Sequence, residues 1–186
     1  MLESTLRSYC LFIHFIVTLI GKLASYLVPL LAAVVAFEVI SRYVFGHPTI
    51  WTNDVSLYLF CSISGLTGAF AQLKKSHIRV DILYVKVSPN MRSIFDLIAY
   101  TLIIIFLFIV LTSCWERLVE AFQNSYKRPS EWAPAVYPFW FICVASSVLM
   151  LAQYSTDFIC SLFRLFTGRK LLAPKKYFAG EQTHEH

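Results

Sequence analysis

Charged residues are scarce in this chain, and so are the groupings of side chains that carry chemistry. Only 15% of the 186 residues are charged, whereas a soluble domain has about a quarter. No internal repeat or low-complexity linker divides the chain, and its five cysteines stand singly with no C-x-x-C pair. Single cysteines inside apolar segments argue against a disulfide framework and against a zinc site.

Hydrophobic residues are abundant instead. They make up 58% of the chain, with 16 Phe, 10 Tyr and 4 Trp, and aromatic rings are typical of both membrane interfaces. A bilayer core about 30 Å thick needs about 20 helical residues. Four stretches qualify: Leu23 to Phe45, Asp54 to Leu73, Asn90 to Gln123 and Ala135 to Phe166. We therefore predict an all-α integral membrane protein with four transmembrane helices in one domain, residues 22–168.

The two ends of the chain differ from this domain. Residues 1–21 are apolar but include Arg7 and His14, and Lys22 follows them. This pattern predicts an N-terminal amphipathic helix that lies in the membrane interface. The alternative is a signal peptide, because Arg7 precedes an apolar run. Residues 169–186 are predicted to form a polar tail.

Basic residues fall unevenly on the two sides of the predicted spans. With four spans, both termini share a side with the connection between the second and third spans. Of the 16 basic residues, only Arg42, Arg117, Lys127 and Arg128 lie on the other side. The positive-inside rule then predicts that both termini are cytoplasmic. The net charge of +5 is thus explained by orientation in the membrane, and not by binding of nucleic acid.

Polar residues mark both sides of the first connection. Glu38 and Arg42 are four residues apart on the first span, so they can pair on one helix face. The alternative is that Arg42 extends to lipid headgroups, and a role in substrate binding is less favoured. Thr52 or Asn53 can cap the second span, with Asp54 in its first turn, where the helix dipole favours an acid.

A second polar motif follows the second span. His77 and Asp81 are four residues apart in the cytoplasmic connection. A His and Asp pair can serve in general acid–base catalysis, but no nucleophile or set of metal ligands accompanies it. A local turn or a docking contact is therefore favoured, and we expect no enzymatic activity.

The second span also carries a seam of small and polar residues. These residues recur at steps of four and three, which places them on one packing face. They are Asp54, Tyr58, Cys61, Gly65, Gly68 and Gln72. Small residues allow backbones to approach, and polar side chains form hydrogen bonds between helices in lipid. The seam predicts contact with a second polypeptide. Packing against the chain's own helices is the alternative.

The order of these motifs resembles the small membrane subunit of tripartite ATP-independent periplasmic (TRAP) transporters, of the DctQ type. The first motif is Arg42-Tyr43-Val44-Phe45-Gly46, which closes the first span. Trp51 and Asp54 then open the second span, and His77-Ile78-Arg79-Val80-Asp81 follows it. The resemblance extends through Pro89 and over the four-span layout, from about Lys22 to Phe166.

The resemblance implies a scaffold subunit of a sodium-coupled transporter in a bacterial inner membrane. A large membrane subunit would carry the substrate and sodium sites. A periplasmic binding protein would deliver an organic anion, a carboxylate or a sulfonate. The small subunit would pack beside the large one and help to form the docking surface. Candidate docking residues in the outer loop are Lys127, Arg128, Glu131 and Trp132. No cofactor is implied in this chain, although membrane lipids are expected contacts.

Two other functions remain open from the sequence. Four helices could anchor a haem-bearing respiratory enzyme, in which paired histidines bind the iron. His47 and His77 fall in connections at opposite ends of a span, and only His14 lies near one. The chain could also be an autonomous small transporter, but it shows no broken helices or paired repeats of the kind that build a midplane site.

Overall fold

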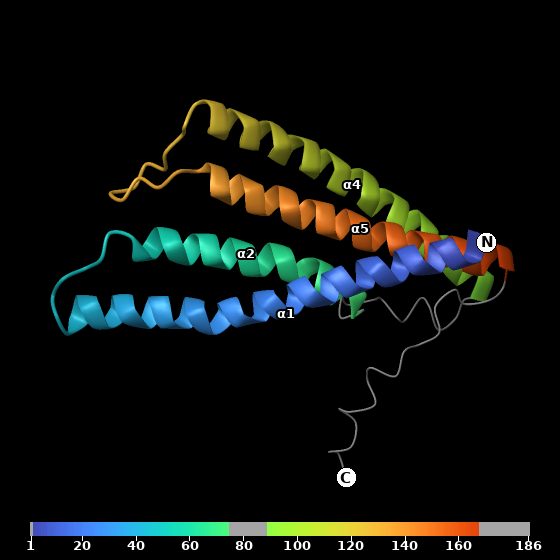
Figure 1. Ribbon diagram of the computed structural model, residues 1–186, viewed down its shortest axis with the longest axis horizontal. Coiled ribbons are helices and arrows are strands. Elements are labelled where there is room, and N and C mark those ends of the chain that lie inside the picture. Colours follow the sequence, from blue (N-terminus) through green and yellow to red (C-terminus); the bar gives the residue numbers. More distant parts are fainter. Residues whose placement is uncertain (1, 75–88, 168–186) are drawn as a thin grey trace, which may run out of the picture.

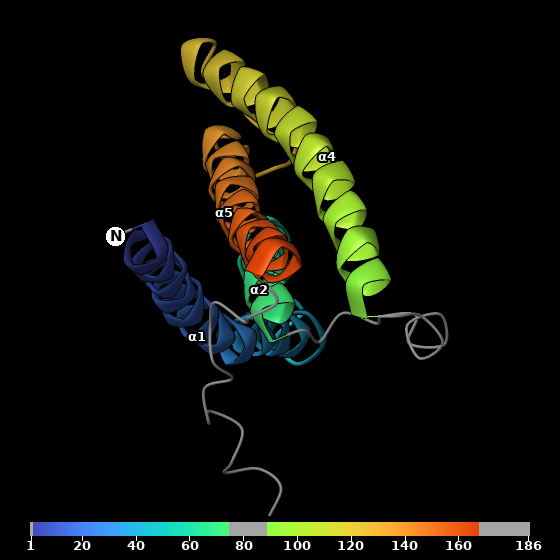
Figure 2. The same ribbon diagram turned by 90° about the vertical axis from the view of Figure 1, so that its right-hand side faces the viewer.

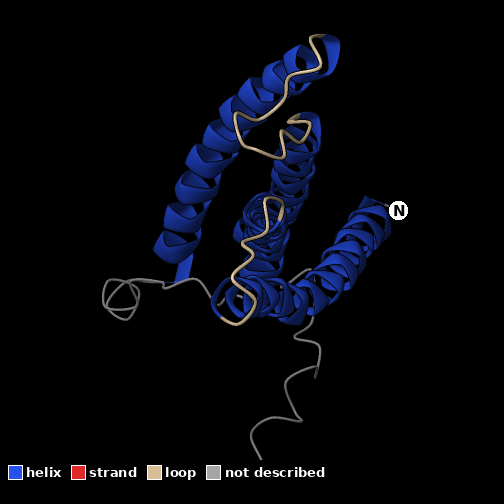
Figure 3. Ribbon diagram, turned by 90° about the vertical axis from the view of Figure 1, so that its left-hand side faces the viewer, coloured by secondary structure: helices blue, strands red, loops and turns tan. Residues whose placement is uncertain are grey.

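A computed structural model describes residues 2–74 and 89–167. These residues form four helices: α1 (Leu2–Tyr43), α2 (Thr52–Leu73), α4 (Pro89–Gln123) and α5 (Tyr137–Thr167). The described ranges contain helices and loops but no strand (Figure 3). All four helices are long and apolar enough to cross a membrane. This confirms the predicted all-α fold with four spans. The predicted motif at His77 and Asp81 and the tail 169–186 lie outside the described residues.

The four helices form an open row. α1 packs on α2, α2 on α5, and α5 on α4, an order that can be followed from bottom to top in Figure 1. α2 and α5 are therefore the inner helices of the row, and α1 and α4 are its edges. The buried share of the apolar window is 28% in α5 but only 6% in α1. Most of the apolar surface of these helices is thus left uncovered by the chain itself.

Helix α1 runs without interruption from the predicted interfacial arm into the first span. Its 42 residues are about 60 Å long as a helix, roughly twice the thickness of the hydrocarbon core. Pro29 lies inside it, and a proline there removes a backbone hydrogen bond and bends the helix. The N-terminal part of α1 leans away from the direction of the remainder (Figure 2). The location of residues 1–21 in the membrane interface stays a prediction.

The N-terminal part of α1 packs across the inner helices. It crosses α2 at Gly21, where an added Cβ atom would lie only 2.4 Å from the ring of Phe70. Further toward the N-terminus, the hydroxyl oxygens of Tyr9 and Ser155 are 3.2 Å apart, so the helix reaches α5. The close crossing requires a residue without a side chain, and Gly21 supplies it.

The two connections of the described chain lie at one end of the row. Residues 44–51 join α1 to α2, and residues 124–136 join α4 to α5. Figure 3 looks onto this end and shows both loops in tan. We call it the outer end, because the distribution of basic residues predicts that it faces the periplasm. The structure places the two loops on one side, as a four-span layout requires.

Candidate functional site

The seam of α2 faces α5 and the loop that precedes it. The hydroxyl of Tyr58 donates a hydrogen bond to the carbonyl oxygen of Ala135 at 2.8 Å. One turn further along, the sulfur of Cys61 lies 3.9 Å from the sulfur of Cys143. Both contacts join α2 to residues more than 70 positions away in the same chain.

The glycines of the seam continue this contact with α5. A Cβ atom on Gly65 would lie 2.3 Å from the hydroxyl oxygen of Ser146, so the two helix backbones approach closely there. A Cβ atom on Gly68 would lie 3.4 Å from the sulfur of Met150, which is an ordinary contact. The absence of a side chain is therefore needed at Gly65 and not at Gly68.

The last seam residue, at the end opposite the outer loops, makes a polar contact with α5. The side-chain amide of Gln72 donates to a carboxylate oxygen of Asp157 in α5 at 2.9 Å. Together with the contacts of Asp54 described below, all six seam residues have neighbours within this chain. The seam thus packs on α5 and the loop before it, which was the alternative, and contact of the seam with a second polypeptide stays a prediction. The residue period identified a packing face, but it carried no information on which helix covers that face.

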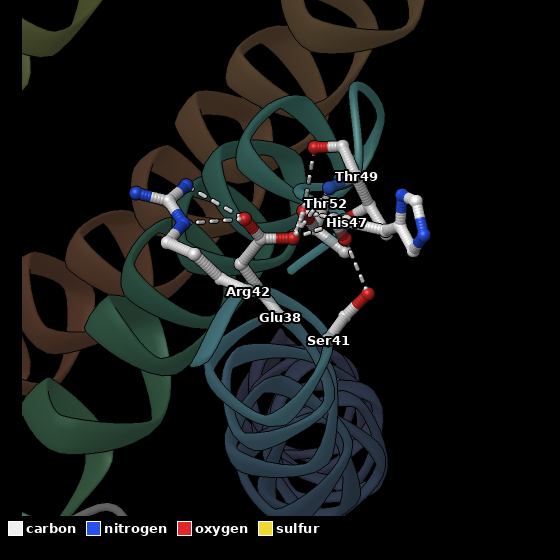
Figure 4. Close-up of polar contacts among 6 residues, drawn as sticks. All are labelled: Glu38, Ser41, Arg42, His47, Thr49 and Thr52. Atoms are coloured by element: carbon white, nitrogen blue, oxygen red, sulfur yellow. Dashed lines mark hydrogen bonds and ion pairs between the residues drawn. The ribbon is translucent and has the colours of Figure 1, made fainter. Parts of the chain in front are cut away.

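At the outer end, one carboxylate organises the first connection (Figure 4). Arg42 donates to one oxygen of Glu38, at 2.6 Å from Nη2 and 3.1 Å from Nε, which is the ion pair that their spacing predicts. The other oxygen accepts bonds from the backbone amide of Thr49 at 3.2 Å and from the hydroxyl of Thr52 at 2.7 Å. The hydroxyl of Thr49 also bonds to it. Glu38 thus ties the end of α1 to the start of α2.

The start of α2 differs from the capping predicted for it. Trp51 is the N-cap residue, and its side chain makes no capping hydrogen bond. Thr52 is only 2% exposed and gives its hydroxyl to Glu38, while Asn53 is exposed. Neither therefore caps the helix, because the longer-range carboxylate takes the threonine hydroxyl. Trp51 instead stacks on Phe37 with ring centroids 5.9 Å apart.

Asp54 faces the second outer loop. It is in the first turn of α2, as predicted, and only 1% exposed. The hydroxyl of Ser130 donates to one of its oxygens at 2.5 Å, and a guanidinium nitrogen of Arg128 lies 3.3 Å from the other. The start of α2 therefore holds the loop between α4 and α5 as well as the loop between α1 and α2.

The predicted docking residues divide into two groups. The side chain of Arg128 is 31% exposed because it turns toward Asp54. Trp132 is 44% exposed, and Lys127 and Glu131 are exposed as well. These three side chains are accessible on the outer loop, whereas Arg128 serves largely to anchor it. Tyr43, the other aromatic residue of the sequence motif, is 80% exposed at the end of α1.

Thr49 and Ser130 are the functional residues that the sequence did not reveal. Both are short polar residues in loops, each bonded to a carboxylate on a helix. The acids near the helix ends were the only signal for such partners, and many loop residues could have supplied them.

The carboxylates at the outer end are used in contacts within the chain. Among residues 2–74 and 89–167 no group of three or more His, Cys, Asp or Glu could hold a metal ion. The carboxylates of Glu38 and Asp54 are engaged with side chains of this chain. Their contacts hold loops in place and leave aromatic and charged residues on the surface.

Comparisons with known proteins agree in identifying a class of transporter subunit. Residues 31–164 match the family described as tripartite ATP-independent periplasmic transporters, DctQ component. The chain is also 24% identical over 155 residues to a protein of Haemophilus influenzae named as a candidate TRAP transporter small permease protein. That match covers 83% of this chain and 94% of the relative. The matched region 31–164 includes the seam residues and the carboxylates of Glu38 and Asp54 with their partners.

Proposed function

Because this chain belongs to the DctQ component family of tripartite ATP-independent periplasmic transporters, we propose that it is the scaffold subunit of a sodium-coupled importer of organic anions. In this proposal it holds a large transport subunit in the bacterial inner membrane, and its outer end receives the periplasmic binding protein. The anion is a carboxylate or a sulfonate. Substrate and sodium sites belong to the large subunit.

The open row of helices is the observation that carries the scaffold role. α1 and α4 form the edges of the row, and at most 28% of the apolar window of any of the four spans is buried inside the chain. Apart from the place where the N-terminal part of α1 reaches α5, the described row is one helix thick, which leaves no interior that could surround a solute. Its uncovered apolar area instead suits a long side-by-side contact with another membrane protein, with lipid on the remaining surface.

The outer end supports the docking role. Its loops present Lys127, Glu131 and Trp132, which include both signs of charge and a large aromatic side chain. Tryptophan is enriched among residues that dominate the energy of protein interfaces, and charged rims steer association. We propose that these three residues contact the binding protein.

The described histidines do not favour a haem anchor. His14 lies in the N-terminal third of α1, and the amide of His47 bonds to the carbonyl of Ser41 near the C-terminal end of that helix. The helix between positions 14 and 41 spans about 40 Å. The two histidines therefore cannot bind one iron from both sides. A Soret band in the purified protein would revive that alternative.

The test is purification of the tagged chain in mild detergent, followed by mass spectrometry and by uptake assays in proteoliposomes. We expect a large multi-span subunit to accompany the chain. Uptake should require this chain, the large subunit, the binding protein and a sodium gradient together. Uptake by this chain alone would contradict the scaffold role, and uptake without sodium would contradict the proposed coupling.

A further inference from the structure

The first turn of α2 connects the two outer loops. Thr52 and Asp54 are two positions apart, so their side chains leave the helix about 200° apart around its axis. Thr52 bonds to Glu38 in the first hairpin of helices, and Asp54 bonds to Ser130 in the second. Both side chains are buried. One turn of helix thus fixes two loops that are far apart in the sequence.

The loop 124–136 has an ordered backbone of its own. The amide of Arg128 donates to the carbonyl of Pro134, and the amide of Val136 donates to that of Tyr126, both at 2.9 Å. The loop also contains a non-glycine residue in the left-handed region, Ala133, with φ of 48°. Such a conformation costs free energy and persists only where surrounding contacts hold it. The amide of Ala133 bonds to the carbonyl and the hydroxyl of Ser130, at 3.1 and 3.2 Å, so an anchor for Ser130 also steadies this turn.

Asp54 is that anchor, and its burial makes the attachment strong. A carboxylate that is 1% exposed is costly to leave without partners. Ser130 supplies a hydrogen bond and Arg128 an opposite charge, so release of the hairpin would strip the buried acid of both. The hydroxyl of Tyr58 adds a second attachment at Ala135.

We propose that Asp54 is a positioning residue for docking: by holding the hairpin, it presents Lys127, Glu131 and Trp132 to the binding protein in a single geometry. This inference rests on the proposed docking function. Asp54 itself is buried and touches no docked partner. Its effect is transmitted through Ser130 and Arg128 to the exposed side chains of the same loop.

The experiment uses the complete complex of both membrane subunits in lipid nanodiscs. The variants are Asp54→Ala, which removes the contacts to Ser130 and Arg128, and Ser130→Ala, which removes the hydroxyl that donates to Asp54 and accepts from the amide of Ala133. The control is Asn53→Ala, which changes the exposed neighbour in the same turn. Hydrogen–deuterium exchange of residues 124–136 reports on the hairpin. The affinity for the substrate-loaded binding protein, and KM against kcat for uptake, report on docking.

We expect exchange of the amides of Arg128 and Val136 to accelerate in both variants and to remain unchanged in the control. The dissociation constant should rise about tenfold in Asp54→Ala, the ratio that corresponds to loss of one hydrogen bond to a charged group. KM for the loaded binding protein should rise while kcat stays the same. A merely structural defect would instead lower kcat through loss of assembled complex.

The outcomes separate this inference from the proposed function. Unchanged exchange in both variants, or faster exchange with unchanged affinity, would overturn the positioning role of Asp54. If the unaltered complex fails to bind the binding protein at all, the docking function itself is overturned. Because Ser130→Ala keeps the buried acid and its ion pair, it tests the idea even if Asp54→Ala does not fold.

Discussion

A methyl group added at Gly65 should push α2 and α5 apart. The Cβ atom of an alanine there would lie 2.3 Å from the hydroxyl oxygen of Ser146 and 2.9 Å from its Cβ atom. Rotation of the hydroxyl could relieve the first contact but not the second, because the Cβ atom is fixed by the backbone. The helices themselves must therefore move. Gly68→Ala is the matched control, since its nearest neighbour is the flexible end of Met150 at 3.4 Å.

The two substitutions should differ in their effect on stability. Replacing glycine by alanine inside a helix stabilises it by about 1 kcal/mol, and this gain applies to both positions. Overpacking a close contact costs about 1–3 kcal/mol, and this cost applies only at Gly65. We therefore expect the free energy of unfolding to fall by about 1 kcal/mol in Gly65→Ala and to stay equal or rise by up to about 1 kcal/mol in Gly68→Ala.

The assay is unfolding of the purified chain in mixed micelles, followed by tryptophan fluorescence. A double-mutant cycle with Ser146→Gly isolates the contact, because this change removes both clashing atoms. Gly65→Ala should be tolerated better in the Ser146→Gly background, with a coupling free energy of about 1 kcal/mol or more. Equal effects of the two glycine substitutions, or a coupling near zero, would refute the close approach of α2 and α5 at this point.

Three further predictions follow from the described contacts. Glu38→Ala should lower stability more than Arg42→Ala does, because it leaves several donors without an acceptor, whereas loss of the Arg42 side chain, which is 57% exposed, should cost less than about 1 kcal/mol. Thermal unfolding of both variants tests this order, and an inverted order would contradict it. Mild oxidation with copper phenanthroline should link Cys61 to Cys143, whose sulfur atoms are 3.9 Å apart, within one chain; a crosslink to another polypeptide, seen on a denaturing gel, would show that the seam faces a partner after all. Trp132→Ala should weaken binding of the binding protein by about tenfold, as loss of an interface aromatic residue does, while co-purification of the large subunit stays unchanged; lost co-purification would place Trp132 in the subunit interface instead.

Local patterns in the sequence predicted the parts of the structure that depend on neighbouring residues. The length of the apolar stretches located the ends of the four spans to within a few residues, except for the start of α1. The spacing of Glu38 and Arg42 predicted their pairing, since both lie on one helix. Asp54 was expected in the first turn of α2 and is found there.

The parts that depend on residues distant in sequence were not predicted. Thr52 has the composition of a cap, yet its hydroxyl bonds to a glutamate 14 positions earlier. Asp54 meets Ser130, 76 positions later. The seam was recognised as a packing face, but the choice between α5 and a second polypeptide depends on how helices are arranged in space. No residue period within one helix contains that information.

The open row of helices has a consequence for the cell. A row with two bare edges keeps few contacts of its own, so much of its stability would come from mass action with whatever covers it. In the proposed complex, copies of this chain made in excess of the large subunit would remain exposed to membrane proteases, and only assembled copies would persist. The abundance of this subunit would then follow that of its partner, which fixes the ratio of the two chains without any separate control of their synthesis.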